Sequence, residues 1–422
     1  MPATFGLIDG NAFYCSCERA FSPRLRGRAV VVLSNNDGCC IARTAEAKAA
    51  GIRMGDPWHL ARNRPEVRAA RVEWFSSNYA LYGDMSRRMY QVLAARVPRV
   101  EPYSIDEMFL DMDVPGDALA LARELRAAVR RAAKIPTCVG VGPTKTIAKL
   151  ANALAKADPG FGGVCDLRCE RERARWYRRL PVSEVWGIGG RTTEKLAALG
   201  IDTVARFLAM PRREARGLLT VVGARVQAEL QGVSCLPLSL VAATKKGVAV
   251  TRSFGRPVTA WAEMREAAAH HAARAGEKLR AEGLVAGRMM VFLHTNPHNG
   301  DPWRSAQHGG RIEPTADSGA LIGEAVRMLR PLWRDGHRYF KVGVVLDDLR
   351  DAEAEPRSMF PTRDPAKSAR LMATLDAVNA RFGRGALRPL STGVARPWGT
   401  RHARLSHRYT TRLDELMEAK AW

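Results

Sequence analysis

Acidic residues border two short apolar segments of this chain, and their placement restricts the possible folds more than any other feature. Residues 5–8 are apolar or glycine and lead directly into Asp9. Asp106 and Glu107 stand immediately before the apolar run 108–110. Runs of β-branched, aromatic and apolar residues are typical of buried strands. Because neighbouring strands can bring such residues to one sheet edge, we expect the three carboxylates to lie close together.

Three carboxylates that lie a few ångströms apart repel one another unless cations lie between them. Carboxylate oxygens are ligands that Mg²⁺ prefers, and two such ions about 3.5–4 Å apart catalyse in-line phosphoryl transfer. The pattern therefore predicts a site for two Mg²⁺ ions, shared by Asp9, Asp106 and Glu107. The alternative is that Asp106 and Glu107 are ordinary polar residues at the end of a strand.

The charge balance favours a polyanionic partner. Lys and Arg number 66 against 43 Asp and Glu, which gives a formal net charge of +23. Such an excess does not specify a fold, but it attracts nucleic acid more readily than a membrane surface. No apolar run approaches the roughly 18 residues of a spanning helix, and the N-terminal residues lack the layout of a signal peptide. We therefore expect a soluble, cytoplasmic protein.

The 422 residues are enough for several domains. Strand and helix patterns up to about residue 165 follow a β-α-β-β-α-β order and predict an α+β fold, with a strand over 103–112 carrying the acidic pair. A second unit, from about residue 247, has a β-α-β-α-β pattern in which residues 296–310 are expected to be irregular. Residues 377–413 contain eight Arg and no acid, which indicates either a solvated face or a docking surface.

Two further features predict contacts with DNA. Residues 180–210 have a helix-hairpin-helix layout, whose glycine turn exposes backbone N–H groups to a DNA phosphate. The alternative for this segment is an ordinary αα-hairpin. The turn consists of Gly187, Ile188, Gly189 and Gly190. A later basic segment offers a track for phosphates through Lys245, Lys246, Arg252 and Arg256.

The order of these motifs over residues 1 to about 350 resembles that of the Y-family translesion DNA polymerases, and within them the UmuC branch. The motifs include the Ser104-Ile-Asp-Glu strand and the helix that follows Gly142-Pro-Thr-Lys. The resemblance implies an α+β multidomain, right-hand polymerase fold. Its expected parts are a palm (1–20 and 76–165), fingers (21–75), a helix-hairpin-helix thumb (166–231), a linker (232–243), an α/β little finger (244–350) and a UmuC-type C-terminal region (351–422).

The resemblance also assigns site residues in the palm. Asp9, Asp106 and Glu107 fall on the catalytic, metal-binding carboxylates, and the backbone carbonyl of Gly10 would be a further metal ligand. Tyr14 falls on the steric gate that excludes a ribose 2′-OH.

The other nucleotide-binding positions implied by the resemblance surround the incoming nucleotide. They are Phe13 beside the gate, Cys39 and Ile41 over the nascent base pair, and Lys48 and Lys145 at the triphosphate. Ala45 stands where most of the family has a phosphate-binding Tyr, so one hydroxyl expected at the triphosphate is missing.

As a function, the resemblance implies error-prone translesion synthesis in DNA damage tolerance and SOS mutagenesis, on primer–template DNA with deoxynucleoside triphosphates. It implies three protein partners: a processed UmuD-like dimer, a RecA filament and a sliding clamp. Met359 and Phe360 are the nearest match to a clamp-binding peptide, although the usual Gln is absent. Two other hypotheses stay open: a catalytically silent DNA-binding scaffold of a damage-response complex, and a two-metal nuclease or cyclase.

Overall fold

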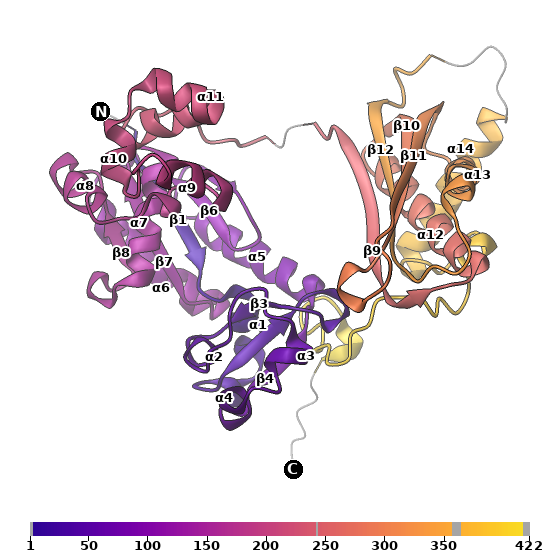
Figure 1. The fold of residues 1–422 in the computed structure, drawn as a ribbon, viewed down its shortest axis with the longest axis horizontal. Helices are drawn as coiled ribbons and strands as arrows, with labels where there is room; N and C mark the ends of the chain where they lie inside the picture. Colours follow the sequence, from indigo (N-terminus) through magenta and orange to yellow (C-terminus); the bar gives the residue numbers. More distant parts are fainter. Residues whose placement is uncertain (1–2, 242–243, 357–363, 417–422) are drawn as a thin grey trace. The chain divides into compact units, whose positions relative to one another are not determined.

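The computed structural model describes residues 3–241, 244–356 and 364–416. The chain forms two compact units, drawn in Figure 1. The first unit comprises Met1–Ser34, Gly38–Ala242 and Arg404–Trp422, and the second comprises Asn35–Asp37 and Ala243–Ala403. Among the described residues, no helix combines the length and the apolar character needed to cross a membrane.

The palm is a mixed sheet with helices on both faces. Its strand order is β5-β6-β1-β7-β8, with β1 antiparallel to both β6 and β7. Alternate residues of β1 face opposite sides, so Ile8 packs with α1, α5 and α6 while Leu7 faces α7. The strands are β1 (Phe5–Gly10), β5 (Val100–Pro102), β6 (Glu107–Asp111), β7 (Thr137–Gly142) and β8 (Val164–Asp166). The helices are α1 (Phe13–Phe21), α5 (Tyr79–Ala94), α6 (Ala118–Ala133) and α7 (Lys145–Ala157).

Helix α7 lies unusually close to the sheet. A Cβ at Gly140 would lie 2.1 Å from the carbonyl oxygen of Ala148 and 2.2 Å from the backbone nitrogen of Asn152. The side-chain amide of Asn152 donates to the carbonyls of Leu7 (3.1 Å) and Cys138 (2.8 Å). Glycine on β7 and this buried amide therefore fix the height and rotation of α7 over β1 and β7.

The fingers and the thumb have separate apolar cores. In the fingers the strand order is β3-β2-β4, with β2 parallel to β4. The finger elements are β2 (Val30–Leu33), β3 (Cys40–Arg43), β4 (Glu73–Ser76), α2 (Ala45–Ala49), α3 (Trp58–Ala61) and α4 (Pro65–Ala69). The thumb helices are α8 (Glu170–Tyr177), α9 (Gly190–Ala197), α10 (Val204–Ala209) and α11 (Arg212–Leu230).

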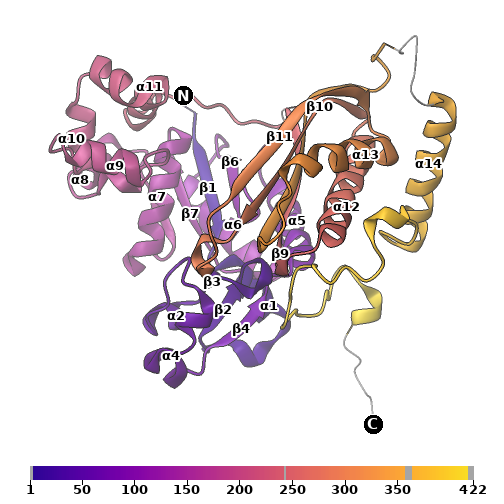
Figure 2. The same cartoon turned by 45° about the vertical axis from the view of Figure 1, so that its right-hand side comes forward.

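In the second unit, α12 and α13 pack on a sheet with strand order β11-β10-β12-β9, as Figure 2 shows. Its strands are β9 (Gly247–Val258), β10 (Leu284–Thr295), β11 (Ser305–Thr315) and β12 (Tyr339–Asp351). The helices are α12 (Trp261–Arg280), α13 (Ser318–Leu329) and α14 (Pro365–Phe382).

Two sequence expectations about strands were wrong. Residues 296–310 are not irregular throughout, because β11 begins at Ser305 and pairs with β10. The order of this unit is therefore β-α-β-β-α-β. The expected strand over 103–112 is divided, because residues 103–106 form a turn between β5 and β6.

Candidate active site

The palm sheet brings the three predicted carboxylates to one end of two neighbouring strands. Asp9 on β1 lies opposite Glu107 on β6 in the antiparallel register. The backbone N–H of Gly10 donates to the carbonyl of Asp106 at 2.9 Å. The hydroxyl of Ser104 donates to Oδ1 of Asp106 at 2.7 Å and accepts from the backbone N–H of Glu107 at 3.0 Å. The turn before β6 therefore holds Asp106 beside the strand end that carries Asp9.

Two ammonium groups from α7 lie against this acidic cluster. Nζ of Lys156 is 2.5 Å from Oδ2 of Asp9, and Nζ of Lys149 is 2.5 Å from Oε1 of Glu107. Burial raises the pKa of Asp9 to about 7; Lys156 opposes this rise, and the charges of Asp106 and Glu107 add to it. Burial and mutual repulsion therefore both disfavour the ionised form of these acids. Nearby cations are needed to keep them ionised as carboxylates.

The chemistry of this donor set fits a divalent cation. Within the described ranges, no three His, Cys, Asp or Glu side chains are already arranged as ligands of one ion. However, Asp9, Asp106 and Glu107 supply hard oxygen donors from adjacent backbone positions, and they are partly neutralised by two flexible lysines. Mg²⁺ binds to such carboxylates while it keeps several waters. The three acids are therefore the residues that would hold a divalent ion.

Lys145 pairs with a carboxylate other than the three predicted acids. The side chain of Lys145 is 5% exposed. Its ammonium pairs with Glu101 and lies 4.9 Å from the centre of the Phe109 ring. Glu101 also accepts from the backbone N–H of Ser239 at 2.7 Å. Lys145, which the resemblance places at the triphosphate, thus stands in this structure at the first turn of α7 and pairs with a buried carboxylate of the neighbouring strand β5.

Lys149 and Lys156 are the residues that the sequence expectations missed. Both lie on α7, at spacings of four and eleven residues from Lys145, and residues at such spacings share one helix face. Helical periodicity could therefore have identified a stripe of three lysines. It could not show which of them meets the carboxylates, because that depends on how far along the sheet the helix lies.

Tyr14 lies in a cluster of aromatic rings at the start of α1. Its ring stacks on Tyr82 with centroids 4.7 Å apart and an interplanar angle of 22°, and it contacts the edge of Tyr79 at 5.8 Å. The Phe13 side chain is buried, with its ring 6.0 Å from that of Tyr14. Burial raises the pKa of Tyr14 to about 12, so the phenol is neutral. The ring of Tyr14 is thus half-buried and supported on one side by Tyr82.

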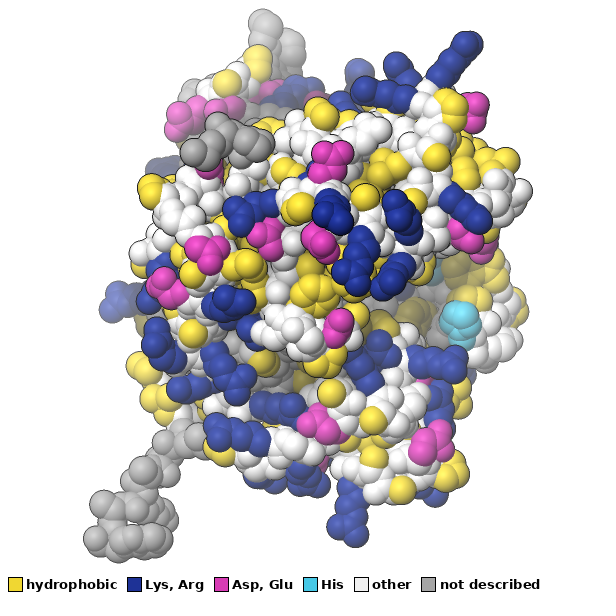
Figure 3. All heavy atoms as spheres, turned by 90° about the vertical axis from the view of Figure 1, so that its left-hand side faces the viewer, with side chains coloured by type: hydrophobic (Ala, Val, Ile, Leu, Met, Phe, Trp, Pro, Cys, Tyr) yellow, Lys and Arg dark blue, Asp and Glu magenta, His cyan; other side chains and the backbone are white. Residues whose placement is uncertain are grey.

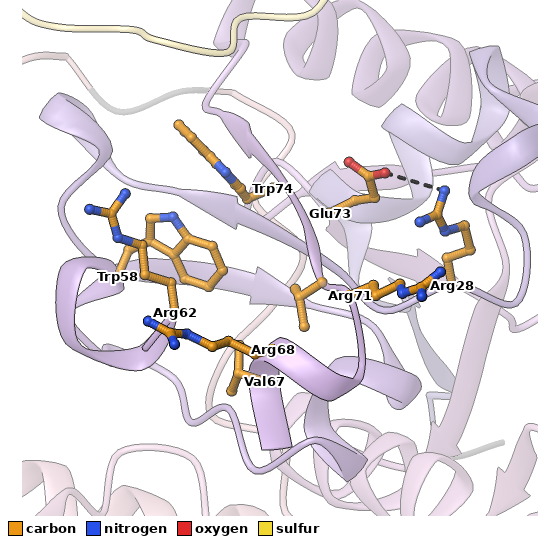
Figure 4. A pocket seen from close by; sticks show the side chains of 9 residues that line it. Arg28, Trp58, Arg62, Val67, Arg68, Arg71, Glu73 and Trp74 are labelled. Atoms are coloured by element: carbon orange, nitrogen blue, oxygen red, sulfur yellow. Dashed lines mark ion pairs between the residues drawn. The ribbon is translucent and has the colours of Figure 1, made fainter. Parts of the chain in front are cut away.

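The predicted finger residues differ in exposure. The side chains of Cys39 and Ile41 are half-buried near the start of β3, whereas Lys48 is exposed on α2. A separate pocket of about 370 Å³ lies in the fingers, and Figure 4 shows the side chains that line it. Its lining includes Arg28, Arg62, Arg68, Arg71, Trp58 and Trp74. None of the site residues predicted from the sequence lines this pocket.

The hairpin predicted to contact DNA stands at the start of α9. Gly187 has a φ of +93°, Gly189 is the residue before α9, and the glycines of this turn are exposed. The Ile188 side chain is 7% exposed and belongs to the thumb core. At Ile188, therefore, only the backbone could contact DNA.

The four basic residues at 245–256 also differ from one another. Lys245 pairs with Glu282 and Arg256 pairs with Glu263. Lys246 and Arg252 are exposed and make no ion pair within the described part of the chain. Basic side chains are also abundant elsewhere: Figure 3 shows Lys and Arg spread across the face that carries the thumb helices. Of the four residues predicted to contact phosphates, Lys245 and Arg256 therefore already form ion pairs within the second unit.

A solved structure shares this architecture. The chain matches the structure of a Y-family DNA polymerase chimera, Dbh-Dpo4(243-245)-Dbh, with a TM-score of 0.67 and 21% sequence identity. The match covers 82% of this chain and 98% of the chimera. At this level of identity the match establishes the fold alone. The fold is that of a Y-family DNA polymerase, as expected from the order of motifs.

Sequence comparisons identify the family. The chain matches the impB/mucB/samB family over residues 8–153, its C-terminal domain over 245–359, the IMS family HHH motif over 178–201 and a domain of unknown function over 369–419. Protein UmuC of Salmonella typhimurium is 42% identical over 99% of this chain and 100% of that protein. Protein MucB of Escherichia coli is 40% identical over 96% and 97%, and DNA polymerase IV 1 of Bacillus subtilis is 26% identical over 91% and 92%. The chain belongs to the impB/mucB/samB family, and it is a DNA polymerase of the Y family.

Proposed function

We propose that this polymerase copies damaged templates with low fidelity during DNA damage tolerance and SOS mutagenesis, and that it transfers nucleotides by a two-metal mechanism. The observation that carries the mechanism is the register of Asp9 opposite Glu107, with Asp106 one residue away. The similarity to proteins named UmuC and MucB supports the role in damage tolerance. Primer–template DNA and deoxynucleoside triphosphates are the substrates.

In this mechanism Asp9, Asp106 and Glu107 would hold two Mg²⁺ ions, and the backbone carbonyl of Gly10 would be a further ligand. Bound ions of this kind polarise phosphate oxygens and make a hydroxyl a better nucleophile at neutral pH. Lys149 and Lys156 are the cations beside the cluster, and we assign them to the phosphate oxygens of the incoming nucleotide, where charge develops.

The nucleotide pocket is proposed to include residues of the palm and the fingers. Tyr14 is the steric gate, because its half-buried ring lies at the palm end of α1 and is backed by Tyr82. Cys39 and Ile41 would cover the nascent base pair, and Lys48 would approach the triphosphate from α2. The half-buried state of Cys39 and Ile41 and the exposure of Lys48 are compatible with these roles.

We also propose three protein partners by similarity to the UmuC branch: a processed UmuD-like dimer, a RecA filament and a sliding clamp. The clamp contact is assigned to Met359 and Phe360, which lie outside the described residues. Similarity over the full length of Protein UmuC supports these assignments.

Primer extension with and without Mg²⁺ tests the proposed function. On a primed template we expect stepwise extension with Mg²⁺, bypass of a template lesion, and no extension in excess EDTA, because the carboxylate cluster would lack its ions. An unprimed template is the control. DNA binding without extension would instead identify a silent scaffold, and shortening of the primer would identify a nuclease.

DNA affinity is expected to fall steeply with salt, because contacts with phosphates release counterions. Each duplex phosphate that is neutralised contributes roughly −0.9 to the slope of log K against log salt. Replacing Lys246 and Arg252 by Ala should make the slope shallower by about 1–2. Replacing Lys245 and Arg256 should change it less, because both already pair with Glu.

Fluorescence anisotropy over a salt series measures these slopes, and sequence-scrambled duplexes control for specificity. Equal slopes for the parent and both double variants would show that residues 245–256 do not contact DNA. The assignment of the phosphate track would then be withdrawn, although the palm assignment would be unaffected.

A further inference from the structure

The segment 404–416, here called the strap, belongs to the first unit although it follows the second unit in sequence. Figure 1 shows the described part of this segment, in yellow, beside α1 and the fingers. The backbone N–H of Ser76 donates to the carbonyl of Arg404 at 3.0 Å, and the backbone N–H of Arg404 donates to the Ser76 hydroxyl at 3.1 Å. The strap therefore begins by pairing with the end of β4.

The Arg404 side chain strengthens this first attachment. Its guanidinium lies 3.3 Å from Glu73 and 5.2 Å from the centre of the Trp74 ring. Glu73 and Trp74 both line the finger pocket in Figure 4. An ion pair and a cation–π contact of the Arg404 side chain thus add to the two hydrogen bonds between Arg404 and Ser76.

A second attachment lies at the start of α5. The side-chain amide of Asn78, which is 3% exposed, donates to the carbonyl and the hydroxyl of Ser406, both at 3.0 Å, and to the carbonyl of His407 at 3.2 Å. The ring of Tyr409 stacks on that of Phe21 with centroids 4.7 Å apart and an interplanar angle of 10°. Because these contacts need particular side chains, the strap is fixed to α1 and α5 by more than its positive charge.

The strap also completes the partners of a buried carboxylate. Glu18 on α1 is 2% exposed, and no Lys or Arg of the described residues forms an ion pair with it. Its Oε1 accepts from the Tyr82 hydroxyl at 2.6 Å and from the Ser406 hydroxyl at 2.9 Å. Burial raises the pKa of Glu18 to about 7, and the bonds from Tyr82 and Ser406 oppose this rise. Two hydroxyl groups therefore donate hydrogen bonds to the buried Glu18 carboxyl group, and one of them comes from the strap.

This bond leads directly to the proposed steric gate. The Tyr82 side chain is fully buried, and its hydroxyl is fixed by Glu18. The ring of Tyr82 forms the surface on which Tyr14 stacks. Contacts therefore run without interruption from Ser406 to Glu18, to Tyr82 and to Tyr14.

We propose that the strap positions the sugar gate: Ser406, through Glu18 and Tyr82, sets the place of the Tyr14 ring and so contributes to discrimination against ribonucleotides. This inference rests on the proposed role of Tyr14. Ser406, Glu18 and Tyr82 are positioning residues, because they act through Tyr14 rather than by touching the nucleotide. The strap lies within residues 369–419, which match a domain of unknown function.

The test compares kcat/KM for a ribonucleotide and the matching deoxynucleotide opposite the same template base. Tyr14→Ala should raise the ribonucleotide-to-deoxynucleotide ratio by about 100-fold, because the space for a 2′-OH is opened. Ser406→Ala and Tyr82→Phe should each raise the ratio by about 3–10-fold, since each removes one hydroxyl from Glu18. Their combination should give less than the product of the two effects, because both act through the same carboxylate.

Two matched variants serve as controls. Ser406→Thr keeps a hydroxyl and should restore the ratio of the parent. Arg412→Ala alters an exposed residue of the same strap, which pairs with Asp414, and should leave the ratio unchanged. The melting temperature of each variant is measured alongside the rates.

The outcomes separate the gate from the strap. A raised ratio in Tyr14→Ala with unchanged ratios in Ser406→Ala and Tyr82→Phe overturns the positioning role and leaves the gate intact. An unchanged ratio in Tyr14→Ala overturns the gate and the positioning role together. Equal losses with both nucleotides would indicate general destabilisation and would also overturn the proposal. If Tyr82→Phe does not fold, the ratios of Ser406→Ala and Ser406→Thr decide the result, because Ser406 is only half-buried and these variants should fold.

Discussion

Replacing Asp106 by Ala is expected to lower nucleotide incorporation by about a thousandfold, the scale seen when one preorganised charge-stabilising group is removed from an active site. The variant would lack one of the three oxygen donors at the strand ends, and divalent ions would bind more weakly. Its affinity for DNA should stay close to that of the parent, because affinity comes mainly from phosphate contacts made elsewhere. Single-turnover incorporation and anisotropy measure the two quantities.

Asp113→Ala is a matched control, because Asp113 is an exposed carboxylate just beyond the end of β6. It should keep normal incorporation. The concentration of Mg²⁺ needed for half-maximal rate should rise for Asp106→Ala but not for Asp113→Ala. Near-normal incorporation by Asp106→Ala would contradict the assignment of the metal site.

Replacing Lys145 by Ala is expected to reduce the free energy of unfolding of the first unit by about 3–5 kcal/mol, as for other buried ion pairs that lose one partner. The change would leave Glu101 buried with the Ser239 N–H as its remaining partner among the described residues. Urea unfolding, followed by tryptophan fluorescence, measures the loss.

Two further variants distinguish this structural role from a role in binding the nucleotide. Removing both charges, with Lys145→Met and Glu101→Leu, should recover most of the lost stability because neither charge then remains buried. Lys156→Ala should cost less stability than Lys145→Ala, since the Lys156 side chain is 38% exposed, but it should weaken binding of the triphosphate. A Lys145→Ala variant that keeps its stability and loses only nucleotide affinity would reverse these assignments.

The palm could be predicted from the sequence because its signals are local. Both strands that carry the acids have apolar runs that are buried on two faces, and such runs are visible without knowledge of the partner strand. The division of 103–112 was missed because the turn depends on the Ser104 hydroxyl, which bonds to Asp106 and Glu107.

Features that depend on distant partners could not be predicted in the same way. Strand β11 has few apolar residues and two adjacent glycines, Gly309 and Gly310, and it is a strand because β10 offers a paired edge. The stripe of lysines on α7 is periodic, but which lysine reaches Asp9 depends on how α7 is seated by the close contact at Gly140 and the Asn152 amide. The hydrogen bond between Ser406 and Glu18 joins residues 388 positions apart. A pattern of neighbouring residues in the sequence could not predict it.

The return of the strap to the first unit has a consequence for synthesis of the protein. At ribosomal rates of about 5–20 residues per second, the strap emerges roughly 20–80 s after α1. During that interval the palm and fingers can already form their sheets, while Glu18 still lacks its hydroxyl partner from Ser406. A chain cut short before residue 404 would resemble this nascent state, so under the proposal above it should discriminate less against ribonucleotides than the longer chain.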